Sequence, residues 1–236
     1  MSPVKKILYK TGIHNWLMMP VNKLLAGAYF IKLCKWISVN RHLEVNDFPT
    51  KIDYKKRYIV HNYIADTLIA NKEINYLEFG TADCETFIWW LQKNTNPASR
   101  FYGFDTFTGL PEDWGIYKKG AFDLQGKIPE INDKRAQLFK GLFQDTLHDF
   151  LKGFSNENPK VILLDADLYS ATLFVLTTLA PLLRDGDIII FDEFSSQQHE
   201  YLAYENFRNA FPYVKLKCFA ASNNYSCVAF KVNIEH

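Results

Sequence analysis

From Pro49 onward, short apolar runs alternate with longer stretches in which apolar residues recur at helical spacing. Such alternation predicts parallel strands that are covered by helices on both faces and joined by right-handed crossovers. The predicted strands are residues 75–79, 100–105, 137–143, 161–165 and 188–191, and the predicted helices are residues 54–70, 86–91, 145–152 and 169–183. The fold class is therefore α/β, with a Rossmann-like, doubly wound and mainly parallel sheet.

The end of the chain departs from this alternation. Residues 213–220 and 225–232 are both strand-like and are separated only by the turn-forming residues 221–224, which predicts an antiparallel C-terminal hairpin. A dinucleotide-binding dehydrogenase domain would instead continue in parallel. A turn at Ser222-Asn223 would place Cys218 opposite Cys227 and a turn at Asn223-Asn224 would not, so no disulfide is predicted.

The chain before Glu44 carries seven basic residues and no acidic one, although the net charge of the whole chain is only +1. The remaining 20 basic and 26 acidic residues give the rest about −6. We therefore divide the chain into a basic, aromatic and helical segment at residues 1–50 and a main domain at residues 51–236. We expect the segment to act as a lid or as a contact in a homo-oligomer, in preference to peripheral membrane contact through residues 1–43.

Several classes of protein are excluded by simple counts. With 48% hydrophobic residues, 11 glycines and 9 prolines, the chain is neither disordered nor a low-complexity scaffold. The longest apolar run near the N-terminus is the eight residues 24–31, well short of the ~20 that cross a bilayer, and no secretory signal precedes it. We expect a cytoplasmic protein, with the membrane-associated alternative above, and no nucleic-acid partner.

Acidic residues follow four of the predicted strands, at the sheet edge where ligands bind in this class of fold. The four strand ends read Glu78-Phe79-Gly80-Thr81, Gly103-Phe104-Asp105, Leu164-Asp165-Ala166-Asp167 and Phe191-Asp192-Glu193. Any single one of these residues can simply cap a helix. Asp105 lies 25 residues after Gly80, a spacing typical of a carboxylate that binds a ribose diol. No G-x-G-x-x-G motif accompanies it, which favours a nucleoside without a pyrophosphate.

Asp165, Asp192 and Glu193 are expected to converge at the centre of this edge. Three carboxylates in a small volume repel one another unless they are protonated or bind a cation. Oxygen ligands favour Mg²⁺, or else Ca²⁺ or Mn²⁺, over zinc. His199, at the start of the next predicted helix, is close enough in sequence to reach the same edge, although a lone histidine is more often a cap or surface residue.

Five stretches, in this order, resemble the macrocin O-methyltransferase family of S-adenosylmethionine-dependent sugar O-methyltransferases. They are YLEFGTADCETFIWWL, RFYGFDTFTGLPEDW, KGLFQDTL, LLDADLYSATLFVL and GDIIIFDEF, within about residues 54–207. The resemblance implies a class I methyltransferase fold, whose sheet ends in a hairpin like the one predicted here. It also implies that Glu78, Gly80 and Thr81 lie at the methionine end of the cofactor.

By the same resemblance, Asp105 would bind the ribose, Asp165 would lie beside the cofactor, and Asp165, Asp192 and Glu193 would hold Mg²⁺. The chemistry of the residues agrees, because a metal chelated by a sugar diol lowers the pKa of the hydroxyl and leaves proton removal to a base. Asp167 or His199 can be that base. The acceptor is expected to be a sugar or glycoconjugate.

Two positions depart from the family pattern: Cys84 stands where the family has Gly, and Glu193 stands where it has a second Asp. Glu193 remains an oxygen ligand, whereas Cys84 would limit how closely the backbone approaches the cofactor. Two alternatives to the enzyme therefore remain. One is a catalytically decayed module that binds carbohydrate or a partner, and the other, disfavoured by the missing glycines, is a nicotinamide oxidoreductase.

Overall fold

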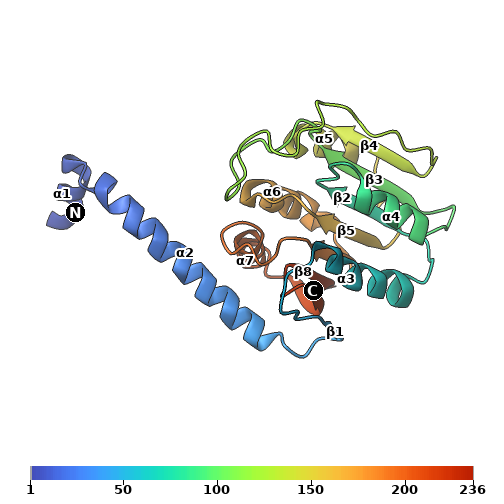
Figure 1. The fold of residues 1–236 in the computed structure, drawn as a ribbon, viewed down its shortest axis with the longest axis horizontal. Coiled ribbons are helices and arrows are strands. Elements are labelled where there is room, and N and C mark those ends of the chain that lie inside the picture. Colours follow the sequence, from blue (N-terminus) through green and yellow to red (C-terminus); the bar gives the residue numbers. More distant parts are fainter. Residues whose placement is uncertain (1, 236) are drawn as a thin grey trace.

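The computed structural model describes residues 2–235 and contains an eight-stranded, mainly parallel sheet with helices on both faces (Figure 1). The strand order is β1-β7-β8-β6-β5-β2-β3-β4, and only the pairs β6–β8 and β7–β8 are antiparallel. The strands are β1 (Val45–Asn46), β2 (Asn75–Phe79), β3 (Arg100–Asp105), β4 (Ala136–Lys140), β5 (Lys160–Leu164), β6 (Ile188–Phe191), β7 (Val214–Ser222) and β8 (Cys227–Ile234). The predicted mainly parallel sheet with a terminal hairpin is thus confirmed.

The helices are α1 (Pro3–Thr11), α2 (His14–Val39), α3 (Arg57–Tyr63), α4 (Glu85–Lys93), α5 (Phe143–Leu151), α6 (Tyr169–Leu179) and α7 (Glu200–Ala210). A 3₁₀ turn, η1 (Tyr54–Lys56), leads into α3, and a π-helical turn, η2 (Ile64–Ile69), continues it. A third short turn, η3 (Ala180–Leu182), follows α6. The single helix predicted over residues 54–70 therefore has three kinds of helical backbone.

Alternating side chains of the strands build a separate hydrophobic core on each face of the sheet. On one face Leu77 and Phe79 of β2 pack with residues of α5, α6 and α7, including Leu147, Val175 and Phe207. On the other face Tyr76 packs with residues of α3 and α4, including Val60 and Trp90. Because β2 and β5 are buried along their whole length, their carboxyl ends are held rigidly at one edge of the sheet.

Two sequence predictions need correction at their boundaries. The predicted strand 137–143 ends at Lys140, because its partner β3 ends at Asp105, and Phe143 instead begins α5. The hairpin loop is Asn223–Ser226, four residues long, with Ser222 opposite Cys227. A register shift after Cys218 places this cysteine opposite Phe230, so the two cysteines do not face each other and both are free.

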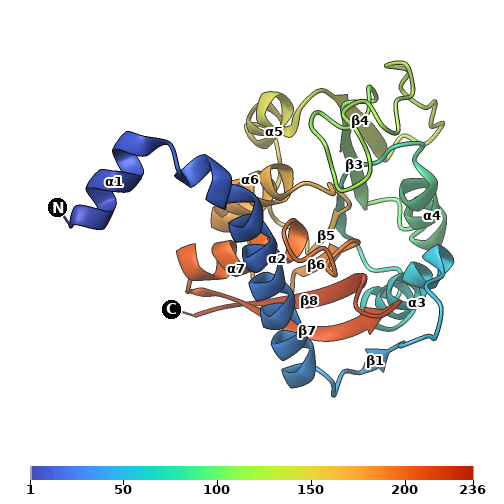
Figure 2. The same cartoon turned by 60° about the vertical axis from the view of Figure 1, so that its left-hand side comes forward.

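Residues 2–39 of the basic segment form a projecting arm, which we call the N-terminal arm (Figures 1 and 2), whereas residues 45–46 of the same segment are β1, the edge strand of the sheet. Only the C-terminal part of α2 packs on the sheet domain, through Leu33 and Trp36, whose indole N–H donates to the Tyr204 hydroxyl at 3.1 Å. α1 lies at the far end of the arm in both views. Among residues 2–235, no helix combines the length and the hydropathy needed to cross a membrane.

Candidate active site

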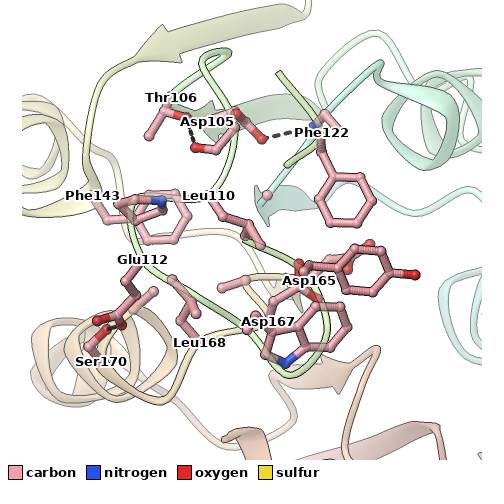
Figure 3. Close-up of a pocket in the computed structure, with 18 of the residues that line it drawn as sticks. Asp105, Thr106, Leu110, Glu112, Phe122, Phe143, Asp165, Asp167, Leu168 and Ser170 are labelled. Atoms are coloured by element: carbon pink, nitrogen blue, oxygen red, sulfur yellow. Dashed lines mark hydrogen bonds between the residues drawn. The ribbon is translucent and has the colours of Figure 1, made fainter. Parts of the chain in front are cut away.

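A cavity of about 560 Å³ opens at the carboxyl ends of β2, β3, β5 and β6, under the loop of residues 106–135 that joins β3 to β4 (Figure 3). This volume is within the range that small-molecule ligands occupy. Within the described chain, five carboxylates and no lysine or arginine line the cavity: Asp105, Glu112, Asp165, Asp167 and Glu193. Acidic walls around a partly enclosed volume attract cations, so the cavity favours a positively charged ligand.

Asp105 and Gly80 form one wall of the cavity, at the ends of β3 and β2. The two carboxylate oxygens of Asp105 accept hydrogen bonds from the backbone N–H of Ala82, at 2.9 Å, and of Phe107, at 2.6 Å. Each oxygen keeps a further lone pair for a ligand hydroxyl. Gly80 has φ +97°, and a Cβ there would lie 1.9 Å from the carbonyl oxygen of Asp165, so only glycine lets these strand ends approach.

Two of the predicted cofactor residues, Glu78 and Thr81, do not line this cavity. The Glu78 side chain is buried behind the wall and accepts a hydrogen bond from the Tyr76 hydroxyl. Burial raises the pKa of Glu78 well above its usual range. Thr81 is also buried, at the start of the loop that leads into α4. In this structure both residues support the wall that Gly80 and Asp105 present.

Arg57, at the start of α3, is the functional-site residue that the sequence reasoning missed. Its Nη1 lies 3.1 Å from Oδ2 of Asp165 and its Nη2 lies 2.8 Å from Oδ2 of Asp192. The guanidinium carbon lies 3.4 Å from the centre of the Tyr54 ring, and Arg57 is only 3% exposed. A buried cation therefore sits between two of the three carboxylates predicted to bind a metal.

The predicted metal ligands Asp165, Asp192 and Glu193 are not brought within common reach of one ion. Among the described residues, one cluster has ligand atoms that all lie within 4.8 Å of one another: His61, Asp192 and Cys227. The Trp90 indole N–H donates to His61 Nδ1 at 2.9 Å, and because indole can only donate, the neutral ring carries its hydrogen on Nε2. Nε2 is then a donor rather than a metal ligand.

Magnesium binding by Asp165, Asp192 and Glu193 stays a prediction. Arg57 already supplies the positive charge between Asp165 and Asp192. In the cluster of His61, Asp192 and Cys227, Nε2 of His61 carries a hydrogen and so has no lone pair for a metal ion.

Asp167 and Glu193 face the cavity from the ends of β5 and β6. Burial, reinforced by Asp165 and by Glu193, raises the pKa of Asp167 to about 8. Burial and Asp165 raise the pKa of Glu193 to about 7. The backbone N–H of Glu193 donates to the buried Glu200 carboxylate at 3.0 Å, which fixes the chain where it leaves β6.

The second predicted base, His199, lies at the N-cap of α7 and does not line the cavity. Burial lowers its pKa, and Nδ1 is buried without a hydrogen-bond partner. Of the two base candidates, only Asp167 is placed where a ligand can reach it.

The loop of residues 106–135 contributes an aromatic wall that the sequence analysis did not recognise. Trp114 and Tyr117 exchange two backbone hydrogen bonds, and their rings stack with centres 5.3 Å apart. The Phe122 ring lies 5.0 Å from Tyr117. All three line the cavity, and Phe122 lies across it from the Glu112–Ser170 pair, in which the serine hydroxyl donates at 2.6 Å (Figure 3). The only sequence signal was the density of aromatic residues in this stretch.

Cys84 stands where the family pattern has a glycine, at a position expected to lie near the cofactor. It has φ +66°, the left-handed backbone that favours glycine, which explains why a glycine suits this position. Its side chain is fully buried in the core beside α4 and does not line the cavity. The substitution therefore leaves the cavity wall unchanged.

The segment covering residues 126–214 matches the sequence model of the macrocin-O-methyltransferase (TylF) family. The resemblance noted in the sequence is thus confirmed for this part of the chain, which contains the motifs around Asp165 and Asp192. No curated protein sequence matches the chain.

Solved structures with a similar fold include CalS11, a calicheamicin methyltransferase, with a TM-score of 0.53, 21% identity, and coverage of 74% of this chain and 76% of that one. The O-methyltransferase NovP has a TM-score of 0.52, 18% identity and coverage of 74% and 78%. The structure titled cmcI-D160 Mg-SAM has a TM-score of 0.51, 17% identity and coverage of 73% and 71%. These similarities establish the class I methyltransferase fold.

Proposed function

We propose that this chain is an S-adenosylmethionine-dependent O-methyltransferase that acts on a hydroxyl of a sugar or glycoconjugate. The observation that carries the proposal is the acidic cavity at the carboxyl edge of a class I methyltransferase sheet. The family match over residues 126–214 supports the same reaction class. An oxidoreductase is disfavoured because the cavity lacks the glycine-rich phosphate cradle of a dinucleotide site.

The residues present fit S-adenosylmethionine. This cofactor supplies an activated methyl group on a positively charged sulfur. Asp105 offers carboxylate oxygens to the ribose hydroxyls, and Leu142 and Phe143 provide an apolar wall for the adenine ring. The carboxylates of the cavity suit the positive charges of the sulfonium and the amino group.

The other half of the cavity suits the acceptor. The rings of Trp114, Tyr117 and Phe122 offer flat apolar faces, and Glu112 offers a carboxylate next to them. Ring faces combined with hydrogen-bonding carboxylates match a sugar, which has apolar C–H faces and polar edges. A sugar held there has its hydroxyls near Asp167 rather than in bulk water.

Asp167 is the group placed to remove the hydroxyl proton. It lines the cavity, and the left-handed backbone of this residue, with φ +58°, is held by the turn after β5. With its pKa raised to about 8, Asp167 accepts the proton in its ionised form, while Arg57 holds the neighbouring Asp165 and Asp192 in ion pairs.

The test is transfer of labelled methyl from S-adenosylmethionine to a panel of sugar nucleotides and glycosides. Asp167→Asn should lower kcat by about 10²- to 10⁴-fold, the usual contribution of a general base. Asp149→Asn, on the exposed face of α5, is the matched control and should retain activity. Full turnover by Asp167→Asn would remove Asp167 from the mechanism. Cofactor binding without transfer to any hydroxyl would support the decayed binding module instead.

A further inference from the structure

The N-terminal arm exposes an unusual number of large apolar side chains. Within the described part of the arm, the large apolar residues that are at least 40% exposed are Val4, Ile7, Tyr9, Ile13, Trp16, Met18, Met19, Val21, Leu24, Leu25, Phe30, Ile31 and Val39. Contiguous exposed apolar surface on a soluble domain marks an interaction site. The cavity and its proposed reaction use none of these residues.

α1, at the tip of the arm, is amphipathic. With 100° per residue, Val4, Ile7 and Leu8 lie within an arc of about 100°. Lys5 and Lys10 flank this arc on its two sides, and Lys6 lies opposite it. A short helix with an apolar arc between lysines is suited to lie in the plane of a lipid interface, because the lysines can extend to the headgroups.

Apolar side chains are exposed on several sides of α2: Met19 and Val39, 72% and 73% exposed, lie on other sides than the group that faces away from the sheet domain. Trp16, Leu24 and Ile31 are 87%, 73% and 66% exposed, and their spacing puts them within about 80° of one another around the helix. Leu33 and Trp36, which pack on the domain, lie on the opposite side. α2 is thus apolar around most of its circumference rather than along one stripe, and its exposed apolar surface continues that of α1.

We propose that the N-terminal arm docks on an anionic membrane surface, with α1 and the outward side of α2 in the headgroup region. Charge selects this partner, because the segment before Glu44 has seven basic residues and no acidic one. Basic residues near an anionic bilayer are attracted by its surface potential, and tryptophan favours the interface. The proposal does not depend on the reaction proposed above.

A second copy of this chain is the competing occupant. Two arms packed together would bring two strongly basic segments into contact, which is unfavourable. An arm on the acidic domain of another copy would have complementary charge. However, the lysines of α1 and its apolar arc point in different directions. A single protein surface would therefore contact either the lysines or the apolar arc, but not both. A lipid interface satisfies both, because apolar core and anionic headgroups lie at adjacent depths.

Sedimentation with lipid vesicles tests the proposal on the full chain. Binding is expected to vesicles of phosphatidylcholine containing about a third phosphatidylglycerol, and to be much weaker with pure phosphatidylcholine. Lys5→Glu, Lys6→Glu and Lys10→Glu together should weaken binding about a hundredfold or more, since each lysine near the surface contributes to attraction. Raising the salt to 0.5 M should also release the protein, because the Debye length then falls to roughly 4 Å.

Two further variants separate charge from apolar contact. Trp16→Gln with Leu24→Gln should also abolish binding, although it leaves the net charge and every lysine unchanged. Reversal of Lys127, Lys134 and Lys217, exposed lysines of the sheet domain, makes the same charge change as reversal of the three α1 lysines and should leave binding intact. Thermal melts should be unchanged in all three, because none of the altered side chains is buried.

Equal binding to neutral and anionic vesicles, or binding that survives reversal of the α1 lysines, would overturn the proposal. A chain that does not bind vesicles but forms dimers in sedimentation equilibrium, and loses them in Trp16→Gln with Leu24→Gln, would also overturn the proposal in favour of a second copy.

Discussion

Arg57 is a buried cation held by two carboxylates, Asp165 and Asp192, and by the face of the Tyr54 ring. Removing one member of a buried ion pair leaves uncompensated charge in a region of low dielectric constant. Arg57→Met should therefore lower the free energy of unfolding by about 3–5 kcal/mol, measured by urea denaturation. Adding Asp192→Asn to this variant should recover part of the loss, because it removes one of the two carboxylates left without a cation.

The matched control is the adjacent residue. Lys56 forms an ion pair with Asp47, but its side chain is 33% exposed, so Lys56→Met should cost no more than about 1 kcal/mol. If Arg57→Met unfolds at the same urea concentration as the unaltered protein, the ion-pair centre does not exist in solution.

His61 makes stability depend on pH. Burial and the nearby Arg57 lower its pKa to about 3, from the ordinary value of 6.5. Below pH 6.5 the unfolded chain binds a proton at this residue and the folded chain does not, so this contribution to stability falls as the pH falls. The difference in free energy of unfolding between the unaltered protein and His61→Gln should decrease by about 2 kcal/mol from pH 7 to pH 5.

His148→Gln is the control for this comparison, because His148 is exposed on α5. Its difference from the unaltered protein should show no comparable change over this range. A His61→Gln difference that stays constant with pH would mean that His61 takes up a proton as readily in the folded protein as in the unfolded chain.

At the scale of single residues, the sequence predicted which carboxylates reach the sheet edge but not what they contact. Asp105, Asp165, Asp167 and Glu193 were found because strand ends are readable from apolar runs. The partner of Asp165 and Asp192 was missed because Arg57 lies more than a hundred residues away in the chain. Pairing at such a separation depends on how α3 packs on the sheet, which no local pattern specifies.

The loop between β3 and β4 is the element that we assign to the acceptor. Trp114→Ala should raise KM for the sugar acceptor at least about tenfold, because the ring loses its contact with the ligand, and should change the Kd of the cofactor little. Ile116→Ala is the control, since Ile116 lies in the same turn, is 87% exposed and does not line the cavity. A rise in the Kd of the cofactor with an unchanged acceptor KM would place Trp114 at the other end of the cavity.

Strands with a strong apolar pattern were predicted accurately, whereas the residues at which one element ends and the next begins were not. β2, β3 and β6 begin and end where the sequence analysis placed them, because each is a buried run bounded by turn or acidic residues. The strand that ends at Lys140 was predicted to run three residues further, because Leu142 and Phe143 extend its apolar pattern. These two residues are apolar for another reason, since they line the cavity and begin α5. The hairpin loop shifted by two residues because its register depends on the irregularity after Cys218.

For the whole molecule, β1 lies within the predicted basic segment of residues 1–50 and yet is an edge strand of the sheet. The expected lid does not lie over the site. Among residues 2–235, no residue that lines the cavity precedes Tyr54. In the sequence, the apolar side chains of the arm do not indicate whether they cover the active site, contact a second copy of the chain or contact a membrane. Each of these roles requires apolar side chains. Only the structure shows that the arm projects from the sheet domain.

The central claim is that the acidic cavity binds S-adenosylmethionine through residues of the sheet edge. Isothermal titration calorimetry of the full chain with the cofactor, in the presence of EDTA, tests it most directly. We predict one site per chain, and a Kd at least tenfold weaker for Asp105→Ala, with no comparable change for the exposed control Asp149→Asn. Absence of binding at millimolar cofactor by the folded protein, or an unchanged Kd for Asp105→Ala, would contradict the account.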